Sequence, residues 1–225
     1  MSHIQDSFMR CAGVCSVLAP LPLLAADIMK MTGSLGFERT IIEWVSFVLF
    51  IPAIFALSYL PAAQGSRLAF VGGAIAYLGA IAGSNIQVLF RVWVILNESG
   101  SSQIVSELLR ANRRLTIPTL SIGIFFPLGL FILAVALYER RVVNPLIALL
   151  LAGGAILFPI AHIPGMRFGR VIGDVLLIAA FGAIGSNFLS TGKDELSGFR
   201  HRRTDDQLVL EGGGIKPPHI WFGKS

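Results

Sequence analysis

The sequence has little charge and almost no cysteine. Charged residues make up 14% of the 225 positions, against roughly 25% in ordinary soluble domains. The two cysteines, Cys11 and Cys15, stand four positions apart. A disulfide within one helical turn is geometrically poor, and two thiols alone make no metal site. A disulfide-stapled or zinc-thiolate domain is therefore excluded, and we interpret both cysteines as small packing residues.

The sequence also lacks the residue patterns of the common active sites. It has four histidines, and only His162 falls in an apolar segment, so a haem held by two helix-borne histidines has no second ligand. We find no phosphate-binding loop, no paired glutamate and histidine for a metal, and no serine-histidine arrangement. We therefore expect no enzyme activity, no cofactor and no metal.

Long apolar runs are the feature that the sequence has in abundance. Hydrophobic residues make up 54% of the chain. Each run has roughly the 20 residues that a helix needs to cross a bilayer. The six runs cover residues 11–31, 40–60, 68–96, 117–138, 143–163 and 169–190. They predict an all-α polytopic membrane protein with six transmembrane helices in contact with lipid. The formal charge of +5 lies mainly in loops and the tail, where membrane proteins keep it, so we expect no nucleic acid.

The chain contains an internal repeat. Residues 54–81 and 83–85 align with residues 157–184 and 185–187, and 11 of the 31 pairs are identical, among them Arg67 with Arg170. A shorter likeness joins residues 20–23 to residues 127–130, which favours an uncleaved first helix over a signal peptide. Each unit holds three spans, so the second unit enters from the opposite side of the membrane. The sequence thus predicts an inverted 3+3 repeat.

The repeat divides the chain into five segments. They are an N-terminal segment at 1–10, transmembrane repeat 1 at 11–96, an interfacial amphipathic linker at 97–115, transmembrane repeat 2 at 116–190 and a polar tail at 191–225. The linker places apolar residues opposite its charges, as a helix in the membrane interface does. The tail cannot bury a core, so we expect it to be mobile or bound to a partner.

Lysine and arginine are distributed almost equally between the two sides of the predicted spans, so they give little evidence for the orientation in the membrane. Inverted repeats place equivalent loops on opposite sides, so the excess of positive charge on the cytoplasmic side is weak. Both termini lie on the same side because the number of spans is even. We place them in the cytoplasm, since Arg91 falls within its helix and does not add to the charge of the opposite face.

Small residues line the third and sixth predicted helices. Gly79 and Gly83 lie on the third helix and Gly182 lies on the sixth. Small faces let helix backbones approach closely, so we expect these glycines at helix contacts and the two helices against each other. The same faces also suit a sliding or gating surface, or a membrane-protein partner.

Polar residues within the apolar runs form two sets. Counting at ~1.5 Å per residue, five ionisable residues fall at similar depth, towards the face opposite the termini: Asp27, Glu43, Arg91, His162 and Asp174. We expect a carboxylate within salt-bridge reach of Arg91, in a structural ion pair or in a solute or proton site. The second set is the repeated pair Ser84, Asn85 and Ser186, Asn187, which either bonds a neighbouring helix or contacts a solute.

The second half of the chain resembles a known family. The likeness rests on Leu-Tyr-Glu-Arg-Arg at 137–141, Pro145, Phe-Pro-Ile at 158–160 and Pro164. In these motifs it resembles uncharacterised bacterial six-helix membrane proteins of a domain-of-unknown-function family, over about residues 117 to 187. The resemblance implies a six-helix bundle in a bacterial inner membrane, and it implies no site residue.

Two functions fit these observations. Inverted repeats, helices interrupted by proline and polar residues inside the spans are shared with many small-solute transporters and channels. The alternative is a non-catalytic accessory or assembly subunit of a larger membrane complex, which would use the small-residue faces or the C-terminal tail to bind its partner.

Overall fold

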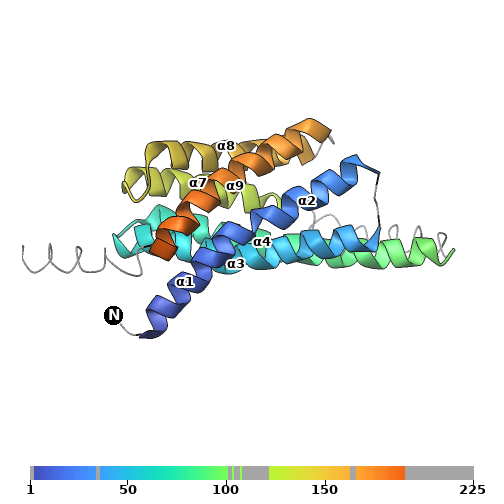
Figure 1. Cartoon of the computed structure of the whole chain (residues 1–225), viewed down its shortest axis with the longest axis horizontal. Helices are drawn as coiled ribbons and strands as arrows, with labels where there is room; N and C mark the ends of the chain where they lie inside the picture. The colour runs from blue at the N-terminus through green and yellow to red at the C-terminus, as the bar shows by residue number, and fades with distance from the viewer. Residues whose placement is uncertain are drawn as a thin grey trace, which may run out of the picture. The chain divides into compact units, whose positions relative to one another are not determined.

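The computed structural model describes residues 3–33, 36–100, 103, 107, 122–162 and 166–190, with side chains from Ser7 onward. These residues form helices and turns, with no strand among them (Figure 1). The helices are α1 His3–Leu18, α2 Pro20–Met31, α3 Phe37–Ala63, α4 Arg67–Glu98, α7 Phe125–Glu139, α8 Pro145–His162 and α9 Arg167–Ser190. The chain divides into two units, Met1–Leu189 and Ser190–Ser225, and the described helices lie in the first unit apart from Ser190 at the end of α9.

Five helical stretches are long and apolar enough to cross a membrane. They are Ser7–Met31, Phe37–Ala63, Arg67–Glu98, Pro145–His162 and Phe168–Ser190. The chain therefore has the build of a multi-pass integral membrane protein. A sixth apolar helix, α7, is shorter, with 15 residues, and residues 117–121 at the start of the predicted fourth span lie outside the described part. Six spans therefore remain a prediction.

The termini of the predicted segments differ from the helix bounds. Helix α1 begins at His3, so the first helix includes most of the predicted N-terminal segment. Helix α4 extends to Glu98, and a turn follows in which Gly100 has a φ of 75°. The remainder of the predicted linker, apart from residues 103 and 107, and the tail at 191–225 lie outside the described residues.

The first membrane span, Ser7–Met31, has a one-residue interruption at Ala19, which keeps right-handed helical dihedrals and donates its N–H to the Cys15 carbonyl at 2.7 Å. Pro20 and Pro22 lack the N–H that a continuing helix needs, so α1 ends at Leu18 and α2 begins at Pro20. The Ser46 hydroxyl of α3 donates to the Ala19 carbonyl at 2.5 Å, which joins α3 to the first span at this point.

The other prolines do not divide their helices. Pro52 lies inside α3 and Pro159 inside α8, while Pro127 occupies the first turn of α7, where a missing N–H costs nothing. Among the described spans, proline therefore coincides with an interruption of the helix only in the first, at Ala19 before Pro20.

The glycines of α4 allow two neighbouring helices to approach. A Cβ on Gly79 would lie 1.9 Å from the backbone nitrogen of Phe126 on α7, and one on Gly83 would lie 2.5 Å from the Phe47 ring of α3. In return, a Cβ on Gly129 of α7 would lie 2.1 Å from the Ala76 nitrogen. The predicted packing role of Gly79 and Gly83 is confirmed.

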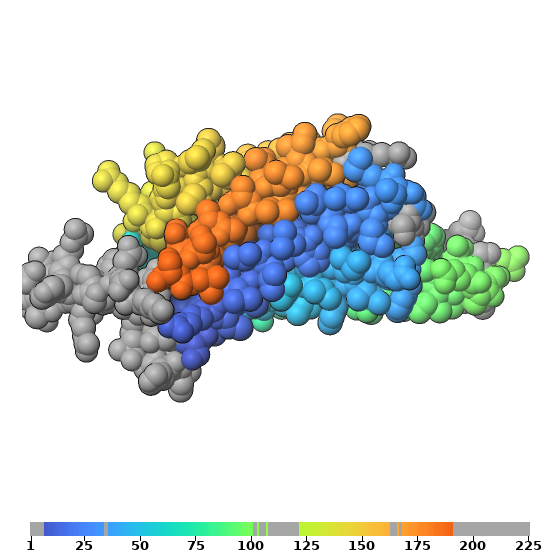
Figure 2. Space-filling model, viewed as in Figure 1, coloured from blue at the N-terminus to red at the C-terminus, as the bar shows by residue number. Residues whose placement is uncertain are grey.

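The small residues of α9 behave differently. Gly185 approaches the carbonyl of Gly13, so α9 packs against α1, and the two helices lie side by side in Figure 2. A Cβ on Gly182 would meet no atom within 4 Å. The prediction for Gly182 is therefore wrong, and so is the expected contact between the small faces of α4 and α9. The small face of α4 packs on α7, the first helix of the second half, and the small face of α9 packs on α1, the first helix of the first half.

Helices α4 and α9, which carry the two copies of the repeated motif, run in opposite directions (Figure 1). An inverted repeat requires this arrangement, and two parallel helices would have excluded it. The rotation that relates the two halves remains a prediction.

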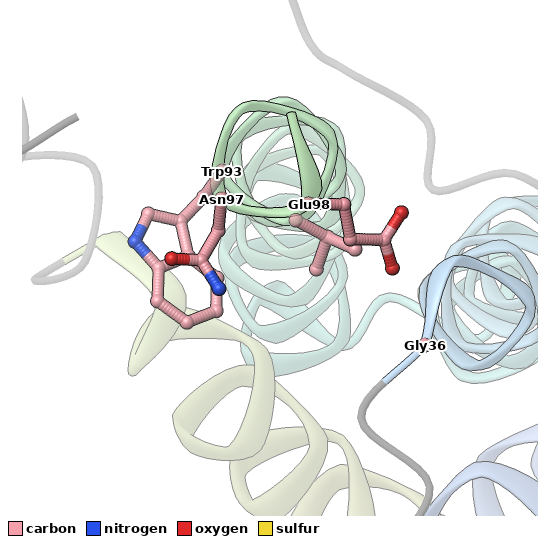
Figure 3. A pocket seen from close by; sticks show the side chains of 5 residues that line it. Gly36, Trp93, Asn97 and Glu98 are labelled. Carbon is pink, nitrogen blue, oxygen red and sulfur yellow. The ribbon is translucent and has the colours of Figure 1, made fainter. Parts of the chain in front are cut away.

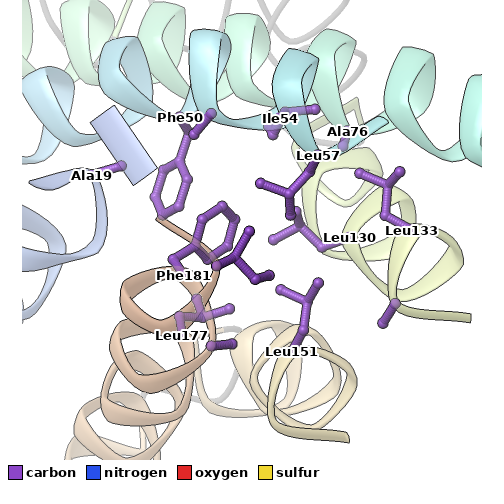
Figure 4. Packing of buried hydrophobic residues seen from close by; sticks show 14 of the residues in the cluster. Ala19, Phe50, Ile54, Leu57, Ala76, Leu130, Leu133, Leu151, Leu177 and Phe181 are labelled. Carbon is purple, nitrogen blue, oxygen red and sulfur yellow. The ribbon is translucent and has the colours of Figure 1, made fainter. Parts of the chain in front are cut away.

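Aromatic and aliphatic side chains from α3, α7, α8 and α9 fill the centre of the first unit (Figure 4). The Phe50 ring makes edge contacts with Phe126 at 5.0 Å and with Phe181 at 5.1 Å between centroids. Leu130, Leu151 and Leu177 are fully buried beside them. Edge-to-face packing of this kind contributes about 0.5–1.5 kcal/mol per pair beyond the buried area.

The outer surface of the helices is also apolar. Phe70, Leu149 and Phe168 are 72%, 68% and 76% exposed. Large apolar side chains turned outwards on several helices are costly in water and favourable against lipid tails. The surface therefore agrees with contact to the bilayer.

Candidate functional site

Four ionisable side chains meet near one end of the helices. Asp27 lies one turn before the end of α2, His162 is the last residue of α8, and Arg170 and Asp174 lie on α9. Arg170 and Asp174 are four positions apart, which puts them on one face of their helix. We call these four residues the charged cluster. Three of them come from the predicted polar set, and Arg170 joins them.

Asp27 lies between two cationic or potentially cationic groups. Its Oδ2 lies 3.2 Å from Nε2 of His162, and its Oδ1 lies 3.7 Å from Nη1 of Arg170. The Asp27 residue is 5% exposed. A buried carboxylate is tolerated when it is paired, and Asp27 meets this condition.

Arg170 holds the end of α8 as well as Asp27. Its Nη2 donates to the His162 carbonyl at 3.1 Å and its Nε donates to the Ala161 carbonyl at 3.4 Å. The last carbonyls of a helix have no partner within the helix, and Arg170 satisfies two of them. The residue is 8% exposed, so its charge is largely removed from water.

His162 is fixed in orientation by Phe158, one turn earlier on α8. The two rings stack with centroids 4.1 Å apart and an angle of 21° between their planes. Nδ1 of His162 lies 2.8 Å from the Phe158 carbonyl oxygen. A carbonyl only accepts hydrogen bonds, so Nδ1 carries the hydrogen. Nε2 is then the nitrogen directed at Asp27.

Asp174 is the most deeply buried member of the cluster. It is 0% exposed, and neither of its oxygens has a hydrogen-bond donor among the described residues. The Asp27 carboxyl lies within interaction range of it. A buried ionised carboxylate without a donor costs several kcal/mol. Asp174 is therefore an acceptor group without a donor in this structure.

Glu43 lies at the edge of the cluster on α3. Its Oε2 lies 4.0 Å from Nη1 of Arg39, one turn earlier, and both side chains are largely buried. Glu43 also acts electrostatically on Asp174. The predicted placement of Glu43 near the other carboxylates agrees with this neighbourhood, although Arg39 and not Arg91 is its partner.

Arg91 does not form the predicted salt bridge. Its guanidinium lies over the ring of Trp44 at 5.2 Å and near that of Phe37 at 5.9 Å. Within the described residues, no carboxylate lies within 4.0 Å of it. The depth estimate placed Arg91 at the level of the carboxylates, but the rotation of α4 turns it towards aromatic rings. A cation over an aromatic face is stabilised without a carboxylate.

The repeated Ser-Asn pairs are not part of this cluster. Ser84 donates to the Ile81 carbonyl at 2.8 Å and Ser186 donates to the Ala183 carbonyl at 2.9 Å. Both hydroxyls thus bond their own helix, three residues back, and not the neighbouring helix. Asn85 and Asn187 are exposed.

Two hollows mark the surface away from the cluster. One of about 250 Å³ is lined by Gly36, Trp93, Val94, Asn97 and Glu98 (Figure 3). The other, of about 470 Å³, is almost wholly apolar and lies between α1, α2 and α3. Neither is lined by a residue of the charged cluster, and Asp174 itself is 0% exposed.

The composition of the cluster favours some ligands over others. In the described part of the chain, no three His, Cys, Asp or Glu residues are arranged to hold a metal ion. Arg170 also places a fixed positive charge next to Asp27. The free acceptors of Asp174 instead suit a ligand that donates hydrogen bonds and carries positive charge.

Comparisons with protein-family models, with curated proteins and with solved structures find no match for this chain.

The sequence analysis missed Arg170 as a member of the site. Two signals for it were present: it matches Arg67 in the repeat, and it stands four positions before Asp174. Arg170 stands at the second position of the predicted sixth span, 169–190, and was counted with the charges at the end of the span, whereas α9 begins at Arg167 and places Arg170 inside the helix.

Proposed function

We propose that this protein is a membrane transporter for a small organic cation, and that the charged cluster binds the cation. The observation that carries the proposal is Asp174, a fully buried carboxyl with two acceptor oxygens and no donor among the described residues. Ionisable residues inside membrane spans are costly, and they commonly mark the path of a solute or ion. The bacterial inner membrane, with both termini in the cytoplasm, is part of this proposal.

The interruption in the first span supports a transport role. Asp27 lies on α2, a separate helix of 12 residues that begins after Ala19. Discontinuous helices next to a polar site are common in secondary transporters. Because Asp174 is fully buried in this structure, a solute would reach it only after a helix moves.

Ligand-induced stabilisation of the purified full chain tests this proposal. Methylammonium, dimethylammonium and guanidinium serve as probes, and the melting temperature in detergent is measured with and without each. A ligand at 100 times its dissociation constant stabilises a protein by about 2.7 kcal/mol. We expect at least one probe to raise the melting temperature of the wild type and of Glu139→Gln, an exposed control, but not of Asp174→Asn.

Two results would overturn it. One is the absence of stabilisation by all three probes. The other is equal stabilisation of the wild type and Asp174→Asn, which would place cation binding away from the cluster.

A second function has one specific observation in its favour. The outward face of α9 carries small residues, with Gly182 open to its surroundings and Ala179 and Ser186 exposed. Such a face lets another membrane helix approach closely, as an accessory subunit of a larger complex would require. Purification in mild detergent distinguishes the two functions, because a stoichiometric membrane partner that is lost in Gly182→Leu favours the accessory subunit.

A further inference from the structure

Three exposed arginines lie on two neighbouring turns between helices. Arg67 begins α4, directly after the turn that follows α3, and Arg140 and Arg141 follow the last residue of α7. Arg140 donates to the carbonyls of Gln64 and Gly65 in the first turn at 3.1 and 3.2 Å. Hydrogen bonds therefore join the two turns, which lie towards the left in Figure 1. We call Arg67, Arg140 and Arg141 the arginine patch.

The arginine patch and the charged cluster lie at opposite ends of α8. This helix begins at Pro145, four residues after Arg141, and ends at His162 of the cluster. Its 18 residues correspond to a length of about 27 Å at the rise of an α-helix, close to the ~30 Å thickness of the hydrocarbon. The patch is therefore separate from the proposed cation site, and its role does not depend on transport.

The protein leaves the positive charge of the patch uncompensated. Within the described residues, none of the three arginines lies within 4.0 Å of a carboxylate. The carbonyls that bind Arg140 accept its hydrogen bonds but carry no negative charge. Glu139, the acidic residue next to Arg140 in the sequence, is itself exposed. One negative charge against three positive charges leaves an excess of positive charge on this surface.

The backbone of Arg141 is strained. Its φ is 52°, and among the described residues no other residue except glycine has a positive φ. The Arg141 N–H bonds the Tyr138 carbonyl at 3.1 Å, and the Val142 N–H bonds the Leu137 carbonyl at 3.0 Å. This pattern is a Schellman helix end, and glycine is the usual residue at the position that Arg141 occupies. Strain of this kind persists mainly at functional sites, which favours a role for the arginine side chain.

Aromatic residues next to the patch indicate its depth in the membrane. Tyr59, near the end of α3, and Tyr138, near the end of α7, are both exposed. Tyrosine is enriched at the boundary between the hydrocarbon and the lipid headgroups. The arginines follow these tyrosines towards the end of the helices, so they lie at the depth of the lipid phosphates.

We propose that the arginine patch binds the phosphate of an anionic phospholipid. A guanidinium donates paired hydrogen bonds to phosphate oxygens, and the lipid tails would pack against exposed apolar side chains such as Phe70 of α4 and Leu146 of α8. A choline headgroup would place a second cation beside the arginines, whereas a glycerol headgroup adds no charge. The patch therefore selects anionic over zwitterionic phospholipids.

Native mass spectrometry of the full chain in detergent tests this site. Phosphatidylglycerol and phosphatidylcholine with the same acyl chains are titrated separately, and the affinity for the first bound lipid is measured. We expect tighter binding of phosphatidylglycerol by the wild type. Arg67→Gln and Arg141→Gly should each weaken it by about fivefold, the contribution of one basic residue near an anionic surface. Lys30→Gln, which removes an exposed positive charge at the end of α2, is the matched control and should leave it unchanged.

The melting temperature of Arg141→Gly separates lipid binding from a structural role. Glycine adopts the positive φ without strain, so in detergent without added lipid this variant should melt at the wild-type temperature or above it. A lower melting temperature together with weaker lipid binding would assign Arg141 to the fold and reject it as a lipid-binding residue. Arg67→Gln then still tests the patch, since Arg67 is exposed.

Three results would overturn the lipid site. The first is equal affinity of the wild type for the two lipids, which does not depend on the folding of any variant. The second is an equal loss of phosphatidylglycerol binding in Lys30→Gln and Arg67→Gln, which would show a general effect of net charge. The third is displacement of phosphatidylglycerol by inorganic phosphate, which would show a site for the free anion. None of these results affects the cation-binding test of the charged cluster.

Discussion

The two copies of the repeated motif place the same arginine in different surroundings. Arg170, in the second copy, is buried, caps the end of α8 and contacts Asp27. Arg67, its counterpart in the first copy, is exposed at the start of α4. There, the carbonyls of Gln64 and Gly65 after α3 accept hydrogen bonds from Arg140 at 3.1 and 3.2 Å. In the first copy, Arg140 therefore caps the end of α3, and Arg67 stays exposed to the surroundings.

The neighbours of the two arginines differ in the same way. At the 103-residue spacing of the repeat, His162 and Asp174 correspond to Tyr59 and Val71, which are both exposed. Asp27 corresponds to Ala134 at the spacing of 107. The end of the bundle that carries the first copy therefore lacks every carboxyl of the cluster. In the described residues, the charged cluster is therefore present in one copy of the repeated motif and absent from the other.

The largest difference between the copies is expected from removing each arginine. Arg170→Met leaves Asp27 buried without its guanidinium partner, and breaking a buried pair costs about 3–5 kcal/mol. Arg67→Met removes an exposed charge and should change stability by no more than about 0.5 kcal/mol. Thermal unfolding of both variants in the same detergent measures the contrast. Equal losses of stability in the two variants would show that the buried contacts of Arg170 do not contribute to the free energy of unfolding.

A smaller difference is expected from matched glycine substitutions. Gly79→Ala forces a Cβ against the backbone of Phe126, and such overpacking costs about 1–3 kcal/mol. Gly182→Ala, at the corresponding position of the second copy, meets open space and should be neutral or slightly stabilising, since alanine favours the helix by about 1 kcal/mol. Melting temperatures again provide the measurement. A loss of stability in Gly182→Ala would contradict the arrangement of α9 described above.

The smallest difference concerns two hydroxyl groups. Ser46→Ala removes a buried hydrogen bond between α3 and the Ala19 carbonyl, and a bond of this kind contributes about 0.5–1.5 kcal/mol. We expect the lower end of this range because the interruption at Ala19 also tolerates local adjustment. Ser84→Ala removes a bond within its own helix and should have almost no effect. Chemical unfolding of the two variants side by side would detect the difference, and a larger loss for Ser84→Ala would be inconsistent with it.

The helices and part of the site could be predicted from the sequence. Apolar runs locate the spans because a bilayer imposes their length, and the bounds of α3 and α4 lie within a few residues of those predicted. Counting residues along the spans also placed Asp27, His162 and Asp174 at a common depth, and the structure places them in contact or close to it.

Depth along a helix does not give rotation about its axis, and this explains the errors. Arg91 has the expected depth but faces Trp44 and not a carboxylate. Gly182 repeats Gly79 in sequence, yet α9 approaches α1 at Gly185, nearly one turn later. Both outcomes depend on which helix lies next to α4 or α9. The sequence does not specify this, because these helices are apolar on all sides.

The melting temperature of Asp174→Val tests the central claim most directly, because this change gives the second copy the residue that the first copy has at Val71. If Asp174 is kept for binding, its buried carboxyl lowers stability, and Arg170 remains paired with Asp27 after the change. The account predicts a melting temperature above that of the wild type, together with the loss of stabilisation by organic cations. A lower melting temperature would show that Asp174 holds the fold together, and it would contradict a binding site at this end of the protein.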